Sequence, residues 1–261
     1  MEVEAERQVA AWLAEATKVT VLTGAGISTD SGIPDFRGPN GLWTADPGAQ
    51  RLFTLRDYLT DSQVRIAAWK IRQAHAAWTA RPNPGHEAIV ELENNGQLRA
   101  IITQNIDGMH QLAGNSEDLV IEVHGSLYEV ECMSCGALTA MSDTLERVTA
   151  GEADPACLRC GGILKARTVS FGQPLEPAVL QAAQAAAQDC QVFLAIGTSL
   201  TVQPVASLVD RAAQHGAKIV IINAEPTPYD QKADARLSSP ISEVLPRIIS
   251  SGEATDARSA S

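Results

Sequence analysis

VTVLTGAGISTDSGIPDFRG, which runs from Val19 to Gly38, is the stretch of sequence that decides the fold. Its opening residues, Val19 to Leu22, favour β-structure and are mostly apolar, as in a parallel strand covered on both faces. The glycines Gly24 and Gly26 allow positive φ angles and the close approach of a ligand to the backbone. Ser28 to Asp30 suit the start of a helical turn, whose free N–H groups would favour a diphosphate. The third glycine of the dinucleotide fingerprint is missing, so an ordinary strand-to-helix turn is the alternative.

The last part of this stretch, GIPDFRG, is a loop that carries candidate binding groups. Pro34 fixes one dihedral angle and prevents a helix from running through the segment. Asp35, Phe36 and Arg37 place an acid, an aromatic ring and a guanidinium side by side, and loops on a rigid scaffold are where binding residues concentrate. An exposed turn with a local ion pair between the acid and the guanidinium is the competing explanation.

Further buried strands end in small or polar residues. We expect these strands at 100–103, 120–123, 191–196 and 218–222. The first runs into Gln104, Asn105 and Asp107, and the second ends on His124. Because the carboxyl ends of parallel strands share one edge of a sheet, where open α/β sheets bind ligands, one cleft should receive all of these residues. Imidazole titrates near neutral pH, so His124 is the candidate general base, with a purely structural histidine as the alternative.

The bulk composition is that of a globular chain. Its 261 residues are 45% hydrophobic, enough for one sizeable core or two modest ones. The net charge of −11 disfavours nucleic acid and anionic membranes and is compatible with basic, lysine-bearing partners, although solubility alone would also explain it. The apolar runs are too short to span a bilayer, and the acidic MEVEAER start is unlike a signal peptide. We therefore expect a cytoplasmic protein without membrane or nucleic-acid partners.

Two CxxC pairs, Cys132 with Cys135 and Cys157 with Cys160, predict a metal site. Each pair can chelate one face of a tetrahedral zinc ion, and the spacing between the pairs is close to that of a four-cysteine site. A redox-active CxxC is the alternative, but a thioredoxin-like motif would need only one pair. Four thiolates close the coordination shell, so one structural zinc ion is expected. The acidic residues around the pairs argue against a ribbon that reads nucleic acid.

All of these motifs occur in one order along the chain. They are GAGIS at 24–28, GIPDFRG at 32–38, TQNIDGMH at 103–110, HG at 124–125, the two CxxC pairs, GTSLTVQP at 197–204 and IINAEPTP at 221–228. In this order the chain resembles the sirtuin family over nearly its whole length, from about Thr17 to Pro246. The resemblance implies a bacterial NAD-dependent protein-lysine deacylase of the deacetylase type, in which NAD and an acyl-lysine peptide meet in a cleft between two domains.

The architecture implied by the resemblance is an α/β fold. A Rossmann-like parallel-sheet domain would carry a smaller inserted zinc-ribbon and helical domain. The discontinuous NAD-binding domain is expected at 1–39, 80–125 and 172–250. The small helical and zinc-binding domain is expected at 40–79 and 126–171, and 251–261 should be a disordered tail.

The resemblance also implies the residues that hold NAD. They are Gly24, Ala25, Gly26 and Ser28 at the diphosphate, Asp35, Phe36 and Arg37 on a closing loop, Gln104, Asn105, Ile106 and Asp107 at the nicotinamide and its ribose, and Gly197, Thr198, Ser199, Asn223, Ala224, Glu225 and Ile241 at the adenosine half. The family's loop itself departs from the hydride-transfer fingerprint, so the missing third glycine is no obstacle.

By the same resemblance, His124 and Asn105 are the catalytic residues. The acyl oxygen would attack the ribose carbon that bears nicotinamide, and nicotinamide would leave. His124 would then help to deprotonate a ribose hydroxyl that attacks the resulting imidate. NAD is thus consumed as a co-substrate, and the products are nicotinamide, free lysine and O-acyl-ADP-ribose.

The acyl-peptide site is implied to lie along Val169, Phe171, Gly172 and Val202, where the peptide adds as a strand through main-chain hydrogen bonds. Two residues depart from the family pattern there. Ser170 stands where a bulkier apolar residue is common, and Gln173 stands where glutamate is common, so peptide docking could be altered.

The acyl preference is read from Trp69 and Arg72, one helical turn apart. The desuccinylating branch of the family pairs tyrosine with arginine at this spacing to bind an acidic acyl group. Because tryptophan lacks the phenol hydroxyl, we expect neutral acyl groups to be preferred. The alternatives are a desuccinylase or demalonylase preference, an NAD-dependent protein ADP-ribosyltransferase, and a non-catalytic NAD-binding zinc module.

Overall fold

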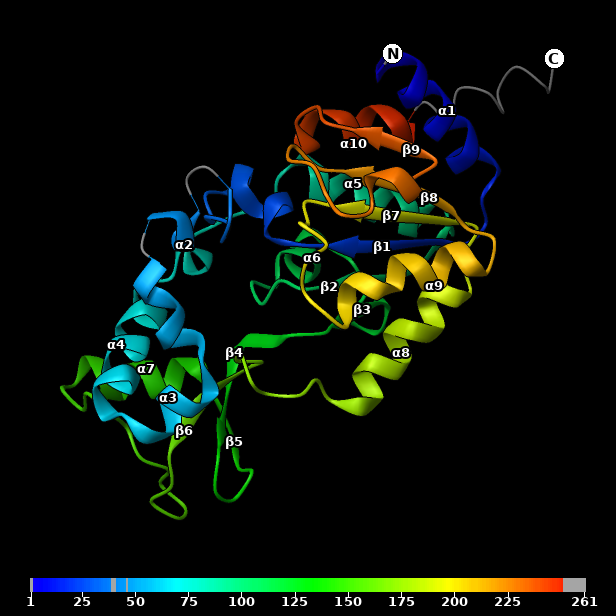
Figure 1. Cartoon of the computed structure of the whole chain (residues 1–261). Helices are drawn as coiled ribbons and strands as arrows, with labels where there is room; N and C mark the ends of the chain where they lie inside the picture. The colour runs from blue at the N-terminus through cyan, green and yellow to red at the C-terminus, as the bar shows by residue number, and fades with distance from the viewer. Residues whose placement is uncertain (1, 39–40, 46, 251–261) are drawn as a thin grey trace.

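The main sheet has six parallel strands and lies at the centre of the larger part of the molecule (Figure 1). The computed structural model describes residues 2–38, 41–45 and 47–250, so the tail expected at 251–261 lies outside the described residues. The strands occur in the order β3 (Val120–Glu122), β2 (Leu98–Thr103), β1 (Val19–Thr23), β7 (Val192–Ile196), β8 (Lys218–Ile222) and β9 (Ala235–Leu237). β1 and β7 are buried at every residue, as expected of central parallel strands.

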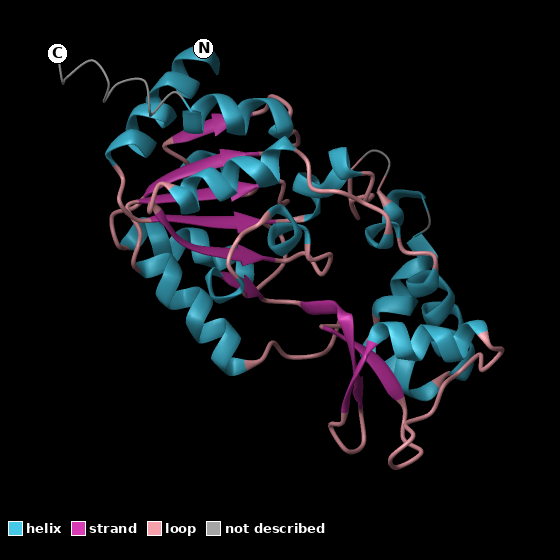
Figure 2. Cartoon of the chain, turned by 180° about the vertical axis from the view of Figure 1, so that it is seen from behind, coloured by secondary structure: helices cyan, strands magenta, loops and turns pink. Residues whose placement is uncertain are grey.

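Helices cover both faces of this sheet (Figure 2). One layer is formed by α1 (Glu2–Glu15), α5 (Pro84–Asn94) and α10 (Ile241–Ser250), and the other by α8 (Pro177–Gln188) and α9 (Leu208–Gln214). Successive strand residues point to opposite faces, so Val21 packs on the first layer and Leu22 on the second. The chain is therefore an α/β protein with a Rossmann-like sheet, as expected from its alternating strands and helices.

A smaller antiparallel sheet lies to one side of the first (Figure 1). Its strands occur in the order β5 (Leu138–Ala140), β4 (Gly125–Cys132) and β6 (Leu164–Thr168), with α7 (Met141–Thr149) beside them. Helical elements from an earlier segment pack here: α2 (Leu42–Ala45), η2 (Pro47–Phe53), α3 (Leu55–Thr60), α4 (Ser62–Gln73) and η3 (Ala76–Trp78), where η marks a 3₁₀ helix. Trp69, Met141 and Leu164 share one apolar core, so two segments distant in sequence are packed together.

Hydrogen bonds and an ion pair join these two segments. The Tyr58 hydroxyl donates to the carbonyl oxygen of Leu164 at 2.8 Å. Arg65 on α4 pairs with Asp154 at 2.8 Å. A parallel bridge also joins Thr54 to Phe171. The helical elements are thus fastened to the small sheet at several points.

Local structure departs from expectation in this region. The segment 40–61 shows no apolar period, yet it forms α2, η2 and α3, elements too short for periodicity to reveal. The apolar pattern of residues 62–79 predicts one helix, but α4 ends at Gln73. It ends there because the His75 ring accepts a hydrogen bond from the N–H of Ala77 and starts a separate 3₁₀ turn.

The remaining helical elements are η1 (Ala25–Ser31), α6 (Met109–Ala113), η4 (Glu117–Leu119), η5 (Val205–Ser207) and η6 (Asp230–Lys232). In the described part of the chain, no helix combines the length and the apolar character needed to cross a bilayer.

Candidate active site and metal centre

The carboxyl ends of β1, β2 and β7 meet, as the sequence predicts. The backbone N–H of Gln104 donates to the carbonyl oxygen of Thr23 at 3.0 Å, and its side-chain amide donates to the hydroxyl of Thr198 at 2.8 Å. The N–H of Gly24 donates to the carbonyl oxygen of Ile196 at 3.0 Å. The loops that follow the three strands therefore form one continuous surface.

Gly24 and Gly26 are required for a different reason from the one expected. Neither has a positive φ. Instead, a Cβ atom at Gly24 would come within 2.7 Å of the Gly197 carbonyl oxygen, and one at Gly26 within 2.7 Å of the Gly197 Cα. Their N–H groups donate to the carbonyl oxygens of Ile196 and Gly197, so these two are not free for a diphosphate. Gly197, against which both glycines pack, has a positive φ of 60°.

Asn105, Ser28 and Asp107 form a buried hydrogen-bond network beside this turn. The amide nitrogen of Asn105 donates to the Gly24 carbonyl oxygen at 3.1 Å and to the Ser28 hydroxyl at 3.3 Å. Ser28 donates in turn to the Asp107 carboxylate at 2.8 Å, and the N–H of Met109 donates to its other oxygen at 3.1 Å. Burial raises the pKa of Asp107. The network places an amide, a hydroxyl and a carboxyl at the strand ends.

His86 belongs to the same network, which the sequence does not reveal. It lies in the first turn of α5, where its Nδ1 accepts the N–H of Asn83 at 3.3 Å in a capping box. The ring proton must then be on Nε2, which lies 3.5 Å from the Ser28 hydroxyl. Burial lowers the pKa of His86 to about 4, so the ring is neutral near pH 7.

His124 lies between β3 and β4 and is partly buried. Its Nδ1 is 3.0 Å from the carbonyl oxygen of Gln104, so Nδ1–H is the donor and Nε2 keeps its lone pair. Burial lowers the pKa of His124, while the hydrogen bond to Gln104 acts in the opposite direction. Gly125, with φ of 74°, lets the chain pass close to β6: a Cβ there would be 2.0 Å from the Arg167 carbonyl oxygen. His124 thus has the form of a neutral general base.

The loop of Asp35, Phe36 and Arg37 is folded on itself and against η2. The Asp35 carboxylate accepts the N–H of Gly38 at 3.1 Å. The ring of Phe36 meets that of Phe53 edge to face, with centroids 6.0 Å apart. Burial lowers the pKa of Arg37. Asp35 and Phe36 are half-buried, whereas Arg37 remains exposed.

The residues expected at the adenosine half follow β7 and β8. The hydroxyls of Ser199 and Thr201 are 2.9 Å apart, and the Asn223 amide donates to the Glu225 carbonyl oxygen at 2.8 Å. Ile241 begins α10 and lies against Gly85 at the start of α5. A Cβ atom added to Gly85 would be 3.1 Å from Cγ2 of Ile241.

The segment expected to pair with a peptide has one edge already filled. Phe171 donates its N–H to the Phe53 carbonyl oxygen at 2.8 Å and accepts the N–H of Leu55 at 3.0 Å. The opposite edge carries Ser170, whose N–H donates to the side-chain carbonyl of Gln173 at 3.2 Å. A peptide strand could pair only on that opposite edge, where the glutamine side chain covers one donor.

Trp69 and Arg72 lie on α4 in the interior of the small unit. The guanidinium carbon is 5.9 Å from the tryptophan ring centroid, and Nη1 donates to the Ala68 carbonyl oxygen at 3.1 Å. Trp69 Nε1 and Arg72 Nε have no hydrogen-bond partner among the described residues. Burial lowers the pKa of Arg72.

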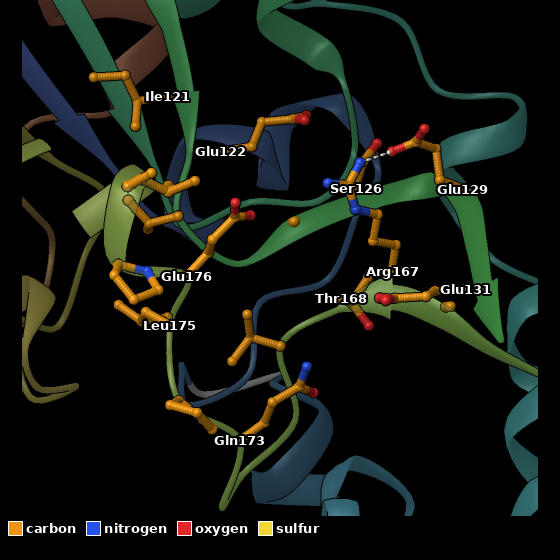
Figure 3. Close-up of a pocket in the computed structure, with 18 of the residues that line it drawn as sticks. Ile121, Glu122, Ser126, Glu129, Glu131, Arg167, Thr168, Gln173, Leu175 and Glu176 are labelled. Atoms are coloured by element: carbon orange, nitrogen blue, oxygen red, sulfur yellow. Dashed lines mark hydrogen bonds and ion pairs between the residues drawn. The ribbon is translucent and has the colours of Figure 1, made fainter. Parts of the chain in front are cut away.

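A separate open groove of about 700 Å³ lies beside the edge strand β3, between β4, β6 and the start of α8 (Figure 3). Glu122, Glu129 and Glu176 give it acidic walls, and Arg167 pairs with Glu129 at 2.7 Å. Among the described residues, none of those expected to bind NAD lines this groove.

The four cysteines of the CxxC pairs come together as predicted. Their sulfur atoms all lie within 4.8 Å of one another, with Cys132 to Cys160 at 3.5 Å and Cys135 to Cys157 at 3.9 Å. Zinc–sulfur bonds of about 2.3 Å in a tetrahedron place sulfur atoms about 3.8 Å apart, so the four thiols fit one zinc ion.

The two halves of the metal site have the same local fold. The N–H of Gly136 donates to the Cys132 carbonyl oxygen at 2.9 Å, and the N–H of Gly161 donates to the Cys157 carbonyl oxygen at 2.8 Å. Both glycines have positive φ, 67° and 72°. Each CxxC pair is thus held in a tight turn that its following glycine permits.

Known proteins resemble this chain in both sequence and fold. The model of the Sir2 family matches residues 24–204. The NAD-dependent protein deacetylase 2 of Streptomyces coelicolor is 51% identical over 88% of this chain and 96% of that protein. The NAD-dependent protein deacetylase 1 of Pyrobaculum aerophilum is 41% identical over 93% and 92%.

Solved structures agree. A Sir2 enzyme structure superimposes with a TM-score of 0.88 at 38% identity, covering 98% of this chain and 100% of that chain. A Sir2 complex with a p53 peptide and NAD+ gives a TM-score of 0.85 at 30% identity, covering 95% and 98%.

Proposed function

The chain belongs to the Sir2 family, and on this premise we propose that it is an NAD-dependent protein-lysine deacetylase. It consumes NAD as a co-substrate and releases nicotinamide, free lysine and O-acyl-ADP-ribose. Relatives named as NAD-dependent deacetylases and deacylases, and a Sir2 structure that holds both a peptide and NAD+, support this activity and an acyl-lysine protein as substrate.

The observation that carries the proposal is the setting of His124. Its Nδ1–H is held by the Gln104 carbonyl oxygen at 3.0 Å, which leaves the Nε2 lone pair available. The next residue, Asn105, donates its side-chain amide to the carbonyl oxygen of Gly24, in the turn that follows β1. A neutral imidazole with one free nitrogen, fixed beside a polar strand edge, can take a proton from a ribose hydroxyl.

The co-substrate supplies a ribose carbon that is activated by its bond to nicotinamide. Asn105 and Asp107 would hold the nicotinamide ribose, because both are buried and linked through the Ser28 hydroxyl. The loop of Phe36 and Arg37 would close over it and exclude water, since Phe36 packs on Phe53 of η2 and is half-buried.

The adenosine half would be held by Gly197 to Ser199, Asn223 to Glu225, and Ile241. With Gly24 to Ser28 at the diphosphate, NAD would be bound by the domain formed by 1–39, 80–125 and 172–250. The segments 40–79 and 126–171 would form the small domain, and the peptide would enter between the two along Val169, Gly172 and Val202. The packing of both small-domain segments in one apolar core supports this division.

One zinc ion in the four-cysteine site would be structural. Four thiolates leave no position for water or substrate, and closed tetrahedral sites stabilise folds instead of performing catalysis.

The acyl group would be neutral. Trp69 offers no hydroxyl, and Arg72 is turned toward the carbonyl oxygen of Ala68 on its own helix. A panel of acetyl-, propionyl- and succinyl-lysine peptides tests this preference: equal catalytic efficiency on succinyl and acetyl peptides would contradict it.

Mass spectrometry of an acetyl-lysine peptide incubated with NAD and zinc-replete enzyme tests the reaction itself. We expect the peptide to lose its acetyl group while nicotinamide and O-acetyl-ADP-ribose appear. A protein that gains the mass of ADP-ribose would instead identify an ADP-ribosyltransferase. Unchanged peptide and protein, with NAD binding retained, would identify a binding module.

A further inference from the structure

His110 is a buried histidine that the proposed mechanism does not use. It lies on α6, directly after the loop of Gln104 to Asp107, and only 1% of its surface is exposed. Its Nε2 is 3.0 Å from the hydroxyl oxygen of Thr23, the last residue of β1. Its ring also meets that of His86 edge to face, with centroids 5.2 Å apart.

The direction of this hydrogen bond follows from counting protons. A threonine hydroxyl has a single proton, and that of Thr23 is donated to the hydroxyl oxygen of Thr103 at 2.8 Å. In the contact with His110, the donor must therefore be Nε2–H. Nδ1 of His110 has no hydrogen-bond partner among the described residues. An unprotonated Nδ1 leaves only a lone pair unmatched there, whereas a cationic ring would bury an N–H with no acceptor.

This chain of hydrogen bonds ends at Asn105. The Thr103 hydroxyl oxygen also accepts the backbone N–H of Asn105 at 3.1 Å. The Asn105 side chain is held separately, by Gly24 and Ser28. The main chain of Asn105 is thus held by the Thr103 hydroxyl, and its side chain by Gly24 and Ser28. The contacts that hold the main chain begin at His110.

We propose that His110 and Thr23 are positioning residues for the deacetylation: through the Thr103 hydroxyl they hold the backbone at Asn105, and hence its amide, in the orientation that receives the nicotinamide end of NAD. The inference rests on the proposed function. Neither residue contacts the reacting atoms. His110 takes no part in proton transfer and acts as a fixed, neutral donor.

A matched pair of threonines on one strand provides the first test. Thr20 and Thr23 are both fully buried on β1, and the Thr20 hydroxyl donates to the Ala186 carbonyl oxygen at 2.8 Å, away from Asn105. Thr23→Val and Thr20→Val each remove one buried hydroxyl at nearly constant volume. We expect Thr23→Val to lower kcat/KM for NAD roughly tenfold with the KM for peptide unchanged, and Thr20→Val to keep both within twofold. Equal effects of the two substitutions would overturn the proposal.

A second pair of variants separates the donor from the packing. In His110→Gln a side-chain N–H₂ can still reach Thr23, whereas His110→Leu fills the space without a donor. We expect glutamine to restore most of the activity that leucine loses. If the two variants have the same kcat/KM for NAD at matched folded fractions, the hydrogen bond has no positioning role.

The tautomer is measured without any turnover. Long-range ¹H–¹⁵N spectra of the folded protein should show His110 neutral with its proton on Nε2, in the presence and absence of NAD. A proton on Nδ1 would refute the hydrogen-bond direction on which the proposal rests. If the wild-type enzyme does not deacetylate, the proposed function fails, while this spectrum and the NAD affinity of Thr23→Val, measured by calorimetry, still decide the role of His110.

Discussion

The Nδ1 atom of His124 lies 3.0 Å from the backbone carbonyl oxygen of Gln104, so the candidate base and the candidate nicotinamide loop are fixed to each other. The ring cannot turn over without losing this bond. Because Asn105 follows Gln104 directly in the chain, this hydrogen bond and the pairing of β2 with β3 hold the base close to the backbone of Asn105.

Activity should fall on the acid side of neutrality as His124 is protonated. Burial lowers its pKa below the usual value of 6.5, so the neutral base form prevails at pH 7 and is lost only at lower pH. A profile of kcat/KM against pH should show a plateau near neutrality and an acid limb with a midpoint below 6.5. His124→Ala should abolish turnover and keep NAD affinity; undiminished turnover in that variant would contradict the assignment.

Stability should also fall in acid, because of His86 and His110. Their folded pKa values, about 4 and about 3, lie below the usual 6.5 because both rings are buried. A lowered histidine pKa means that the unfolded chain binds more protons, so this stability is complete above pH 6.5 and decreases as the pH falls toward 4. The free energy of unfolding should change with pH by up to about 1.4 kcal/mol per pH unit for each histidine.

Urea denaturation at pH 7, 6 and 5 measures this slope. His110→Gln should reduce it by the share of one histidine. A free energy of unfolding that stays constant from pH 7 to pH 5 would show that the two rings do not titrate on unfolding.

Removing one thiolate should release zinc and loosen the small unit. Cys157→Ala leaves three ligands at a site whose binding energy is also folding energy, so metal content and melting temperature should both fall. Cys190, which is buried under β1 and hydrogen-bonds to Ala187, is the control: Cys190→Ala should keep one zinc ion per chain. Unchanged metal content in Cys157→Ala would refute the site.

Gln173 should weaken peptide binding by occupying the Ser170 N–H. Gln173→Ala frees this donor for a peptide strand, and a hydrogen bond worth about 1 kcal/mol corresponds to a peptide KM about fivefold lower. Gln173→Glu keeps an acceptor at the same place and should retain the wild-type KM. The KM for NAD should be the same in all three proteins. A higher peptide KM in Gln173→Ala would mean that the glutamine assists docking.

The sequence predicts most of the large sheet and the metal site because each rests on a local signal. Buried strands such as Val19–Thr23 are short apolar runs, and the spacing of Cys132, Cys135, Cys157 and Cys160 already defines a chelate. The place of His124 just after a strand is predicted in the same way.

What the sequence does not show depends on contacts between distant residues. Gly24 and Gly26 must be glycines because the turn at Gly197 packs against them. This contact joins distant residues, so neither stretch of sequence reveals it alone. His86 and His110 look like ordinary helix residues until the fold brings them to Ser28 and Thr23. The filled edge at Phe171 likewise depends on Phe53, far away in the chain.

Phe53 connects the loop expected to close over NAD with the expected peptide edge. Its ring meets that of Phe36 on this loop, and its carbonyl oxygen accepts the N–H of Phe171 beside the peptide edge. If each segment binds its expected substrate, a shift of either neighbour can be passed to the other through Phe53. Thermodynamic linkage then requires reciprocity: whatever factor peptide adds to NAD affinity, NAD adds to peptide affinity, and the enzyme would favour the ternary complex over either binary one if that factor exceeds unity.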